Sequence, residues 1–283
     1  AGLGANRFEA PPAYRALHDE HFDFFSIYAK DMAYYDVFLM APADGFTYFT
    51  VEKEGDFGMA INGVDSSLKD VWSVAASQAR VAVSDTRPYA PSGNIPAQFI
   101  AAPITESGRV IGVVAVQISL DSIDAFMIAR PGMGLTGESY LVGADGRMRS
   151  DSFLCPEGRS VAASFAGTVS ANGVSSLAVR EAFAGRSAVR KIVGYRGERV
   201  LSAYAPVQFF GVTWAIVAEI GQAEIDAKIA AALNTRITVI IFGSLALLLI
   251  LALAISLIIS RGIARVTDEL NLLMGGVLSG QGA

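Results

Sequence analysis

The sequence predicts an α+β protein in which two lobes of one design follow each other in tandem, ahead of a single membrane-crossing helix. Three observations carry this prediction. Strand and helix signals run to about residue 130 of the 283 and then restart. The two halves share short motifs at matching places. A stretch near the C-terminus is apolar for long enough to cross a bilayer.

The first half opens with a predicted helix over residues 13–33. Its apolar side chains recur at close to helical spacing. They are Leu17, Phe24, Phe25, Tyr28 and Met32. Residues 35–50 are predicted to form a hairpin, because two runs rich in β-formers surround a turn at Asp44-Gly45. A helix is expected over 66–78, capped by Asp65 or Ser66.

The predicted elements that complete the first half are strands at 80–84, 98–104 and 110–119 and a short helix at 120–129. The second half repeats the order. The Ala-Asp-Gly of 43–45 returns at 144–146, and Gln117-Ile118 at the end of one strand corresponds to Glu219-Ile220. The further predicted elements are a helix at 176–183 and strands at 188–195, 198–206 and 213–220. Each lobe has about 90 to 100 residues, enough for a core of its own.

The membrane-crossing segment is predicted from Ile237 to Ser260, a run without a charged residue. About 24 residues at roughly 1.5 Å each give about 36 Å of helix, against a hydrocarbon core of about 30 Å. Arg261 and Arg265 follow the run and Arg236 precedes it, which favours a cytoplasmic C-terminus. We therefore expect residues 1 to about 236 to be extracytoplasmic. No breaker separates Gln222 from the run, so one continuous rod is expected.

Composition excludes several other functions. The net charge of -5 does not favour nucleic-acid binding, which is typical of basic proteins. A single cysteine, Cys155, excludes an intrachain disulfide. The two histidines, His18 and His21, both lie in the first predicted helix, so they fit a solvated helix face better than a metal site or a catalytic triad. The pattern G-x-G-x-x-G at 132–137 lacks the strand before it and the helix after it that dinucleotide binding needs. We predict no catalytic residue, metal or cofactor.

Two stretches carry a family resemblance. Gly134–Asp151, which reads GLTGESYLVGADGRMRSD, resembles the opening of the membrane-proximal lobe of the double Cache domains of bacterial methyl-accepting chemotaxis proteins and transmembrane sensor kinases. Val110–Leu120 resembles the last strand of the membrane-distal lobe. The resemblance covers about residues 13–260. It implies two PAS-like lobes with antiparallel sheets on a long N-terminal helix, a homodimer, and a ligand in the distal lobe.

The resemblance divides the chain into five parts. They are an N-terminal helix (1–34), a distal Cache lobe (35–130), a proximal Cache lobe (131–221), a linker and transmembrane helix (222–260), and the start of a HAMP-like cytoplasmic linker (261–283). The HAMP likeness rests on the Ser-Arg-Gly-Ile-Ala-Arg-Val-Thr of 260–267, which lacks the usual proline. A further N-terminal membrane helix and a cytoplasmic signalling module are expected in the whole receptor.

Seven residues are predicted to form the distal pocket, because aromatic walls with a few polar groups suit a small ligand. They are Tyr48, Trp72, Asp85, Arg87, Tyr89, Phe99 and Gln117. The alternative is that Trp72 and Phe99 are core residues and that Arg87 is solvated. If Arg87 points inward, it favours an anionic ligand.

The ligand class follows from a departure from the family pattern. Amino-acid-binding members carry Arg-x-Trp-Tyr, whereas residues 70–73 here read Asp-Val-Trp-Ser. Gln117 stands where those members have an Asp for the ligand ammonium. Without the Arg and the Asp, an ordinary α-amino acid would bind poorly. We therefore expect another kind of small molecule.

The implied function is a small-molecule-sensing domain of a transmembrane chemoreceptor in the bacterial inner membrane. Its signal would pass through the membrane helix. The alternatives are the input domain of a sensor histidine kinase or cyclic-nucleotide enzyme, a membrane-tethered extracytoplasmic enzyme, and a structural module without a ligand. The shortage of catalytic constellations argues against an enzyme.

Overall fold

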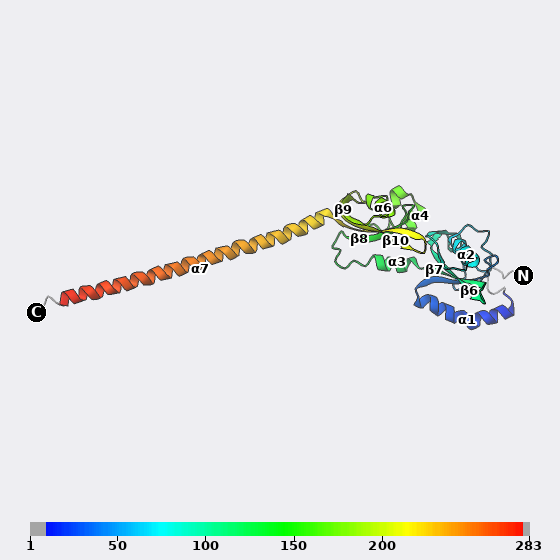
Figure 1. Ribbon diagram of the computed structural model, residues 1–283, viewed down its shortest axis with the longest axis horizontal. Coiled ribbons are helices and arrows are strands. Elements are labelled where there is room, and N and C mark those ends of the chain that lie inside the picture. Colours follow the sequence, from blue (N-terminus) through cyan, green and yellow to red (C-terminus); the bar gives the residue numbers. More distant parts are fainter. Residues whose placement is uncertain (1–9, 280–283) are drawn as a thin grey trace. The chain divides into compact units, whose positions relative to one another are not determined.

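The structure, a computed structural model, describes residues 10–279, with the backbone alone for nearly all positions after 253. The chain up to Glu224 forms one compact unit that holds both lobes, and the chain from Ile225 onward forms a second unit. Figure 1 shows the two sheets of the first unit and the long helix α7.

The distal lobe is a five-stranded antiparallel sheet in the order β2-β1-β7-β6-β3. Helix α1 packs on β1, and α2 packs on β6 and β7, so the sheet lies between helices (Figure 1). A small β4-β5 hairpin completes the lobe. The elements are α1 (Pro12–Asp31), β1 (Tyr34–Met40), β2 (Thr47–Thr50), α2 (Ser67–Gln78), β3 (Ala82–Val83), β4 (Arg87–Tyr89), the 3-10 turn η2 (Ala90–Ser92), β5 (Ile95–Ala97), β6 (Phe99–Glu106) and β7 (Arg109–Ile118).

The proximal lobe follows the short helix α3 (Leu120–Met127) and has a four-stranded antiparallel sheet in the order β8-β11-β10-β9. Helix α6 covers one face of this sheet through contacts with β10 and β11, as α2 covers the distal sheet. Its elements are β8 (Glu138–Val142), α4 (Val161–Ala166), α5 (Val169–Asn172), α6 (Leu177–Phe183), β9 (Ala188–Val193), β10 (Arg199–Phe209) and β11 (Val212–Gly221).

The predicted fold class is confirmed, and the repeat is visible in its turns. Gly45 and Gly146 both adopt a left-handed backbone, with φ of 72° and 75°, which glycine reaches without strain. The preceding aspartate accepts a backbone N–H two residues on in each lobe, from Phe46 to Asp44 and from Arg147 to Asp145. The shared Ala-Asp-Gly is therefore one turn used twice.

Several local predictions were wrong in detail. The strand expected at 80–84 is only Ala82–Val83, and the stretch between it and the strand expected at 98–104 contains the β4-β5 hairpin and a 3-10 turn. Its prolines at 88 and 96 lie opposite each other, which a two-stranded edge ribbon tolerates. Helices α4 and α5 were not predicted; both are very short, and each begins at a Ser or Thr cap, Ser160 and Thr168.

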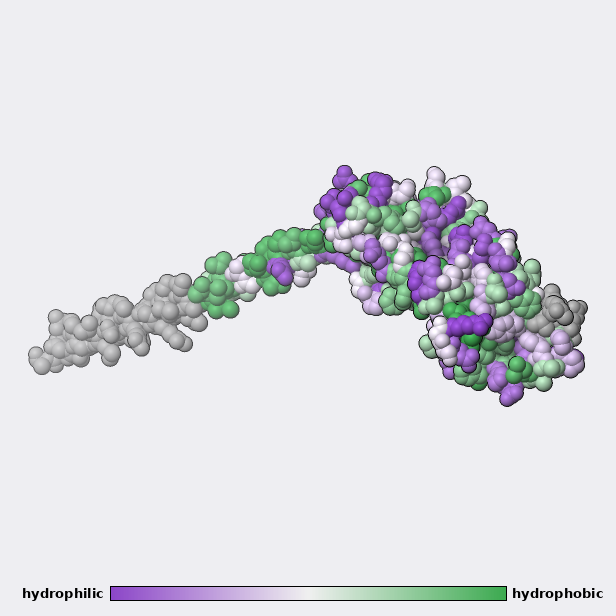
Figure 2. Space-filling view, turned by 45° about the vertical axis from the view of Figure 1, so that its right-hand side comes forward, coloured by the Kyte–Doolittle hydropathy of each residue, from purple (hydrophilic) through white to green (hydrophobic). Residues whose placement is uncertain are grey.

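Helix α7 runs without interruption from Gln222 to Ser279, as the absence of a breaker predicted. Its stretch from Gln222 to Leu253 is long and apolar enough to cross a membrane and is not buried against the rest of the protein. Figure 2 shows the described surface of this helix as largely hydrophobic. The HAMP-like segment predicted at 261–283 is helical as far as Ser279 and otherwise falls outside the described residues, as do residues 1–9.

Candidate functional site

The end of the distal core carries a row of three side chains on adjacent strands. Asp36 of β1 lies opposite Gln117 of β7, which in turn lies opposite Phe99 of β6. Residues two apart on a strand share a face, and Phe38 and Ala115 belong to the core that packs against α2. The row therefore points to the α2 side of the sheet. All three side chains of the row are at least nine-tenths buried.

Tyr89 of β4 closes over this row. Its ring lies edge-on to that of Phe99, with 4.8 Å between centroids. Its hydroxyl donates to Asp56 Oδ2 at 2.6 Å, from a position that is 1% exposed. Burial raises the pKa of Asp56, the hydrogen bond from Tyr89 opposes this rise, and the charge of Glu54 adds to it. The same surroundings raise the pKa of Tyr89, so its phenol stays protonated and remains a donor.

Asp36 is the most enclosed carboxyl of the distal lobe. It accepts the Thr50 hydroxyl and the backbone N–H groups of Val37 (2.6 Å), Val51 (2.8 Å) and Glu52 (3.2 Å). Burial nevertheless raises its pKa to about 7 against the effect of these donors. Asp36 thus changes protonation near neutral pH.

Two buried oxygens in this cluster have no hydrogen-bond partner among the described residues, Asp56 Oδ1 and Gln117 Oε1. An unpaired buried polar atom costs free energy, so such atoms in native proteins usually meet water or a ligand. Both of these atoms are acceptors. The cluster therefore complements a group that donates hydrogen bonds or carries positive charge.

Gln117 also lines a cavity of about 330 Å³ between the two lobes. Tyr35, Ser92 and Pro96 line it from the distal lobe. The hydroxyl groups of Tyr35 and Ser92 both donate to the Glu54 carboxylate, that of Tyr35 at 2.9 Å. The remaining lining residues are Ile95, Ile118, Ser119, Leu120, Asp121, Asp124, Asp151, Ser160, Val161 and Ala162. The volume suits a small organic molecule.

The electrostatic character of this cavity is negative. Burial raises the pKa of Asp124 to about 6, with the charges of Asp151 and Asp121 adding to the rise and the Asp151 N–H opposing it at 2.6 Å. Burial also raises the pKa of Asp151. Among the described residues that line the cavity, none is Lys or Arg. A cation or a neutral hydrogen-bond donor would be favoured here, and a free carboxylate would not.

The other four predicted residues lie elsewhere. Trp72 donates its Nε1–H to the carbonyl oxygen of Ala41 at 2.9 Å. Ala41 directly follows β1, whereas Asp36 lies near the start of this strand, so Trp72 is at the other end of the strand. The Tyr48 hydroxyl lies beside Gly112, whose side of β7 faces away from α2. Arg87 is 41% exposed and pairs with Asp70 at 2.6 Å and with Asp65 at 3.5 Å. Tyr89, Phe99 and Gln117 are therefore the three of the seven that the fold gathers.

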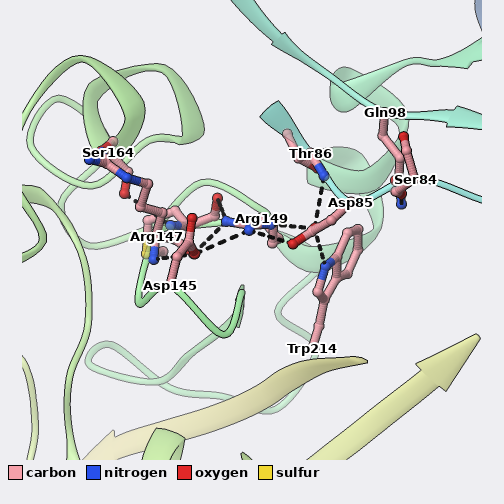
Figure 3. A network of polar contacts seen from close by, with 10 residues as sticks. Ser84, Asp85, Thr86, Gln98, Asp145, Arg147, Arg149, Ser164 and Trp214 are labelled. Atoms are coloured by element: carbon pink, nitrogen blue, oxygen red, sulfur yellow. Dashed lines mark hydrogen bonds and ion pairs between the residues drawn. The ribbon is translucent and has the colours of Figure 1, made fainter. Parts of the chain in front are cut away.

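Asp85 lies at the contact between the lobes (Figure 3). Its carboxylate accepts hydrogen bonds from the Nε–H and Nη2–H of Arg149 at 2.8 and 2.7 Å and from the indole N–H of Trp214 at 2.8 Å. The Arg149 side chain, 1% exposed, also pairs with Asp145 at 3.1 Å. Burial alone would raise the pKa of Asp85, but Arg149 and Trp214 together hold it below its usual value. A bidentate pair of this kind fixes orientation as well as distance.

Four residues of these networks were not predicted from the sequence, and they differ in whether their sequence context could have revealed them. Asp36 stands in an apolar strand run, where a carboxylate is unusual and could have been noticed. Asp56 sits in a loop rich in charge and glycine, where it has no distinguishing context. Arg149 and Trp214 meet Asp85 across 64 and 129 positions, a proximity that only the packing of the lobes creates.

A helix-covered antiparallel sheet thus occurs twice in tandem, with a buried polar row in the first lobe and a cavity between the two lobes. Residues 16–125 match the family model of the methyl-accepting chemotaxis protein-like first PDC sensor domain. PDC and Cache describe the same kind of domain, so the predicted resemblance to double Cache sensor domains is confirmed. The chain has a sensing role.

Solved structures similar to this chain include other receptor domains. One is the ligand-binding domain of the Pseudomonas fluorescens chemoreceptor CtaA with L-leucine (16% identity, 69% of this chain and 74% of that one, TM-score 0.44). Another is the ligand-binding domain of the Pseudomonas aeruginosa chemoreceptor PctC with GABA (18%, 66% and 74%, 0.43). A third is an extracellular ligand-binding receptor from Desulfohalobium retbaense (13%, 70% and 32%, 0.49). No curated protein sequence matches the chain.

Proposed function

We propose that this chain is the extracytoplasmic sensor of a transmembrane chemoreceptor, and that its ligand binds in the cavity beside Gln117. The observation that carries this proposal is that Gln117, whose buried Oε1 has no partner among the described residues, lines a cavity with three carboxylates and no described basic side chain. Asp36 lies opposite Gln117 on the neighbouring strand, and the buried Tyr89–Asp56 pair belongs to the same polar cluster. Tyr35 provides an aromatic wall of the cavity.

The ligand class follows from this charge pattern. A small amine or a polyol brings the donors that the cavity lacks. An ordinary α-amino acid also brings a carboxylate, which needs an Arg or Lys partner. Arg87, the nearest predicted candidate, is already paired with Asp70 and lies in solvent. The ligand is therefore a neutral or cationic small molecule rather than a zwitterionic amino acid.

Transmission follows from what the cavity touches. Its distal wall includes Pro96 of the β4-β5 hairpin, and the segment that leads into this hairpin carries Asp85. A ligand that moves the hairpin would change the Asp85–Arg149 contact between the lobes. At the end of the proximal lobe, Glu224 in the first turn of α7 accepts the N–H of Leu135 and the N–H and hydroxyl of Thr136. The ligand must favour one arrangement of these contacts over another to carry a signal.

The membrane and dimer assignments belong to the same proposal. The apolar part of α7 would cross the inner membrane, with residues 1 to about 236 outside. Helix α1 exposes a set of large apolar side chains, which a second copy of the chain would cover. They are Leu17, Phe24, Ile27 and Tyr28, and Met32 follows at the C-cap of the helix. A chemotaxis signalling rod is the proposed output, and a histidine kinase or cyclic-nucleotide enzyme would use the same input.

The test is a thermal-shift screen of the full chain in detergent micelles against amines, polyols and α-amino acids. A ligand that binds the folded state alone raises the melting temperature, by an amount that grows with concentration. We expect amines or polyols to give the shift. Gln117→Leu should abolish it, because the unpaired acceptor is gone, and Arg87→Ala should leave it unchanged.

Two results would contradict this proposal. One is a shift given only by α-amino acids and retained in Gln117→Leu, which would place the ligand elsewhere. The other is chemical turnover of the bound molecule, followed by mass spectrometry, which would make the protein an enzyme instead of a non-catalytic receptor.

A further inference from the structure

The cavity between the two lobes receives acidic groups from both of them. On the distal side, Tyr35 of β1 and Ser92 at the end of η2 line it, and both of their hydroxyls donate to Glu54. On the other side, Asp124 of α3 and Asp151 of the segment between β8 and α4 line it. The backbone N–H of Asp151 donates to Asp124 at 2.6 Å, so these two residues are neighbours. Carboxylates therefore stand at two places around one space.

The distal group presents acceptors, although two of its members are hydroxyls. A hydroxyl has one hydrogen to donate and two lone pairs that accept. Tyr35 and Ser92 both give their hydrogen to Glu54. The hydrogen bond to Glu54 is also the main cause that raises the pKa of Tyr35 to about 12, so the phenol keeps its proton. Both hydroxyl oxygens thus retain only lone pairs, next to a carboxylate, and they suit an incoming donor.

No basic side chain neutralises these carboxylates in the described part of the chain. The ion pairs there use other acids, as in Arg149 with Asp85, and none of them includes Glu54, Asp124 or Asp151. Among the residues that the structure describes, no three acidic, histidine or cysteine side chains gather closely enough to hold a metal ion. An organic cation is therefore the counter-charge that suits this cavity.

The two acidic groups act on different neighbours. Burial raises the pKa of Asp56 in the distal lobe, and the charge of Glu54 adds to this rise. Burial also raises the pKa of Asp124, and there the added charges are those of Asp151 and Asp121. An ammonium group held at one of these places therefore leaves the carboxylates at the other without a counter-charge.

Gln117 supplies an observation that is independent of the carboxylates. Its side chain lines the cavity and is only 5% exposed, and its Oε1 has no hydrogen-bond partner among the described residues. A buried acceptor that stays unpaired costs free energy, so it indicates a donor on the ligand. An ammonium group is such a donor.

We propose that the ligand of this cavity is a diamine, a short chain with one ammonium group held beside Glu54 and the other beside Asp124 and Asp151. This inference rests on the proposed sensing function and narrows its ligand class. An ammonium group has three donors and no acceptor, which matches a lining of carboxylates and oxygen lone pairs. The cavity of about 330 Å³ is much larger than one ammonium group, and Ile118 and Leu120 are among the apolar residues that would contact the carbon chain.

A ligand with two charged ends would link the two lobes directly. Glu54 belongs to the distal lobe and Asp151 to the proximal lobe, so each end of the diamine has a partner in a different lobe. A monoamine reaches only one of these places and leaves the lobes unlinked. The diamine therefore favours the arrangement in which the two acidic groups lie closest, which is the differential binding that a signal needs.

The test is isothermal titration of the full chain in detergent micelles at pH 8 with four-carbon probes that differ only at their ends. The probes are 1,4-diaminobutane, butylamine, 1,4-butanediol and γ-aminobutyrate. We expect about one diamine per chain, bound at least tenfold more tightly than each of the other three, because the second ion pair adds to the first. The three-carbon and five-carbon diamines are titrated as well, since the separation of the two acidic groups selects the chain length.

Substitutions test the two ends separately. Glu54→Gln should reduce the preference for the diamine over butylamine to threefold or less, because one ammonium group then lacks its carboxylate. Asp124→Asn should weaken diamine binding at least threefold, with Asp151 still present at that end. Glu106→Gln removes an exposed carboxylate of the distal lobe that does not line the cavity, and it should keep the wild-type preference. Circular dichroism checks that each variant folds.

The wild-type titrations alone can refute the proposal, even if a variant unfolds. Butylamine, butanediol or γ-aminobutyrate that binds as tightly as every diamine would overturn the diamine, and an amine or polyol in that role would leave the sensing proposal standing. A folded Glu54→Gln that keeps the full preference would also overturn it, because the second ammonium group would lie elsewhere. If none of the probes binds and the thermal-shift screen of amines and polyols is empty too, the proposed function fails together with the diamine.

Discussion

The two lobes carry one row of three positions at the same place in their sheets and fill it with different chemistry. The distal row is Asp36, Gln117 and Phe99, and the proximal row is Glu138, Glu219 and Ser202. The central position holds a neutral amide in one lobe and a carboxylic acid in the other. Gln117 of the distal row lines a cavity of about 330 Å³, whereas Glu138 and Glu219 of the proximal row line one of about 20 Å³. The two sheets thus share the position of this row, while the size and charge of its surroundings differ.

The largest expected effect concerns the first position of the distal row. The folded-state pKa of Asp36, about 7, lies above the unfolded value of 3.8. The stability that this carboxyl contributes is therefore fully present below about pH 4 and is lost as the pH rises through 7. At about 1.4 kcal/mol per pKa unit, the loss is up to about 4 kcal/mol.

This pH dependence can be measured by urea unfolding of the full chain in micelles from pH 4 to 8. Trp72 reports on the distal lobe and Trp214 on the proximal lobe, because the sequence has two tryptophans. Asp36→Asn should flatten the decline seen through Trp72, and Asp70→Asn, at an exposed position, should not. A wild-type profile that stays level across this range would show that Asp36 does not titrate there.

The next effect is on the bridge that ties the two lobes together. Arg149→Ala leaves Asp85 and Asp145 without their shared cation. Removing one partner of a buried pair costs about 3–5 kcal/mol, and the lower end applies because the Asp85 side chain is 37% exposed. We expect the free energy of unfolding in urea to fall by about 3 kcal/mol. The fluorescence of Trp214, which donates a hydrogen bond to Asp85, should change at a lower urea concentration than in the wild type.

Arg87→Ala is the control for this bridge, since it removes a solvent-exposed pair worth about 0–1 kcal/mol. Equal losses in the two variants would contradict a structural role for the Arg149 bridge. If Arg149→Ala left the unfolding of each lobe unchanged, the lobes would be independent in stability.

An exchange at the central position tests whether the rows are equivalent. Gln117→Glu places a second carboxyl opposite Asp36, which imitates the proximal pair. At pH 8 this should destabilise the distal lobe by about 2 kcal/mol, within the range for an uncompensated buried polar group. The loss should shrink at pH 5, where a carboxyl with a raised pKa is protonated. Equal destabilisation at both pH values would point to altered packing instead of charge.

Most of the fold could be predicted from the sequence, because strand alternation, turn glycines and serine caps are local signals. The repeated Ala-Asp-Gly placed the lobes, and the long apolar run placed helix α7. Short elements escaped: β4 and β5 have three residues each and contain prolines, which conceals a strand. Such segments are held by their neighbours more than by their own composition.

The residues of the candidate site were harder to predict than the fold, for a physical reason. Tyr89, Phe99 and Gln117 could be chosen because family position and strand ends favour them. The sequence could not show that Arg87 and Asp85 lie apart from these three residues. The burial and the ion pairs of a loop side chain depend on which surface packs against that loop. Arg87 faces solvent beside Asp70, whereas Asp85, two residues earlier, meets the other lobe. That difference arises from tertiary packing alone.

The smallest effect compares the helices that cover the two rows. Ser66 caps α2 by accepting the Lys69 N–H at 3.1 Å, and Ser176 caps α6 by accepting the Val179 N–H at 3.4 Å. Replacing an N-cap serine by alanine costs about 1 kcal/mol. Ser66→Ala should therefore lower the unfolding free energy by about 1 kcal/mol, and Ser176→Ala by less, because its hydrogen bond is longer.

The two cap variants are best measured in parallel through Trp72 and Trp214, so that each lobe reports on its own helix. A larger loss for Ser176→Ala would mean that α6 depends on its cap more than α2 does. The reason would lie in length, since α6 has 7 residues and α2 has 12. A shorter helix has fewer internal hydrogen bonds to offset a lost cap. The comparison thus decides whether cap geometry or helix length controls the stability of the covering helix.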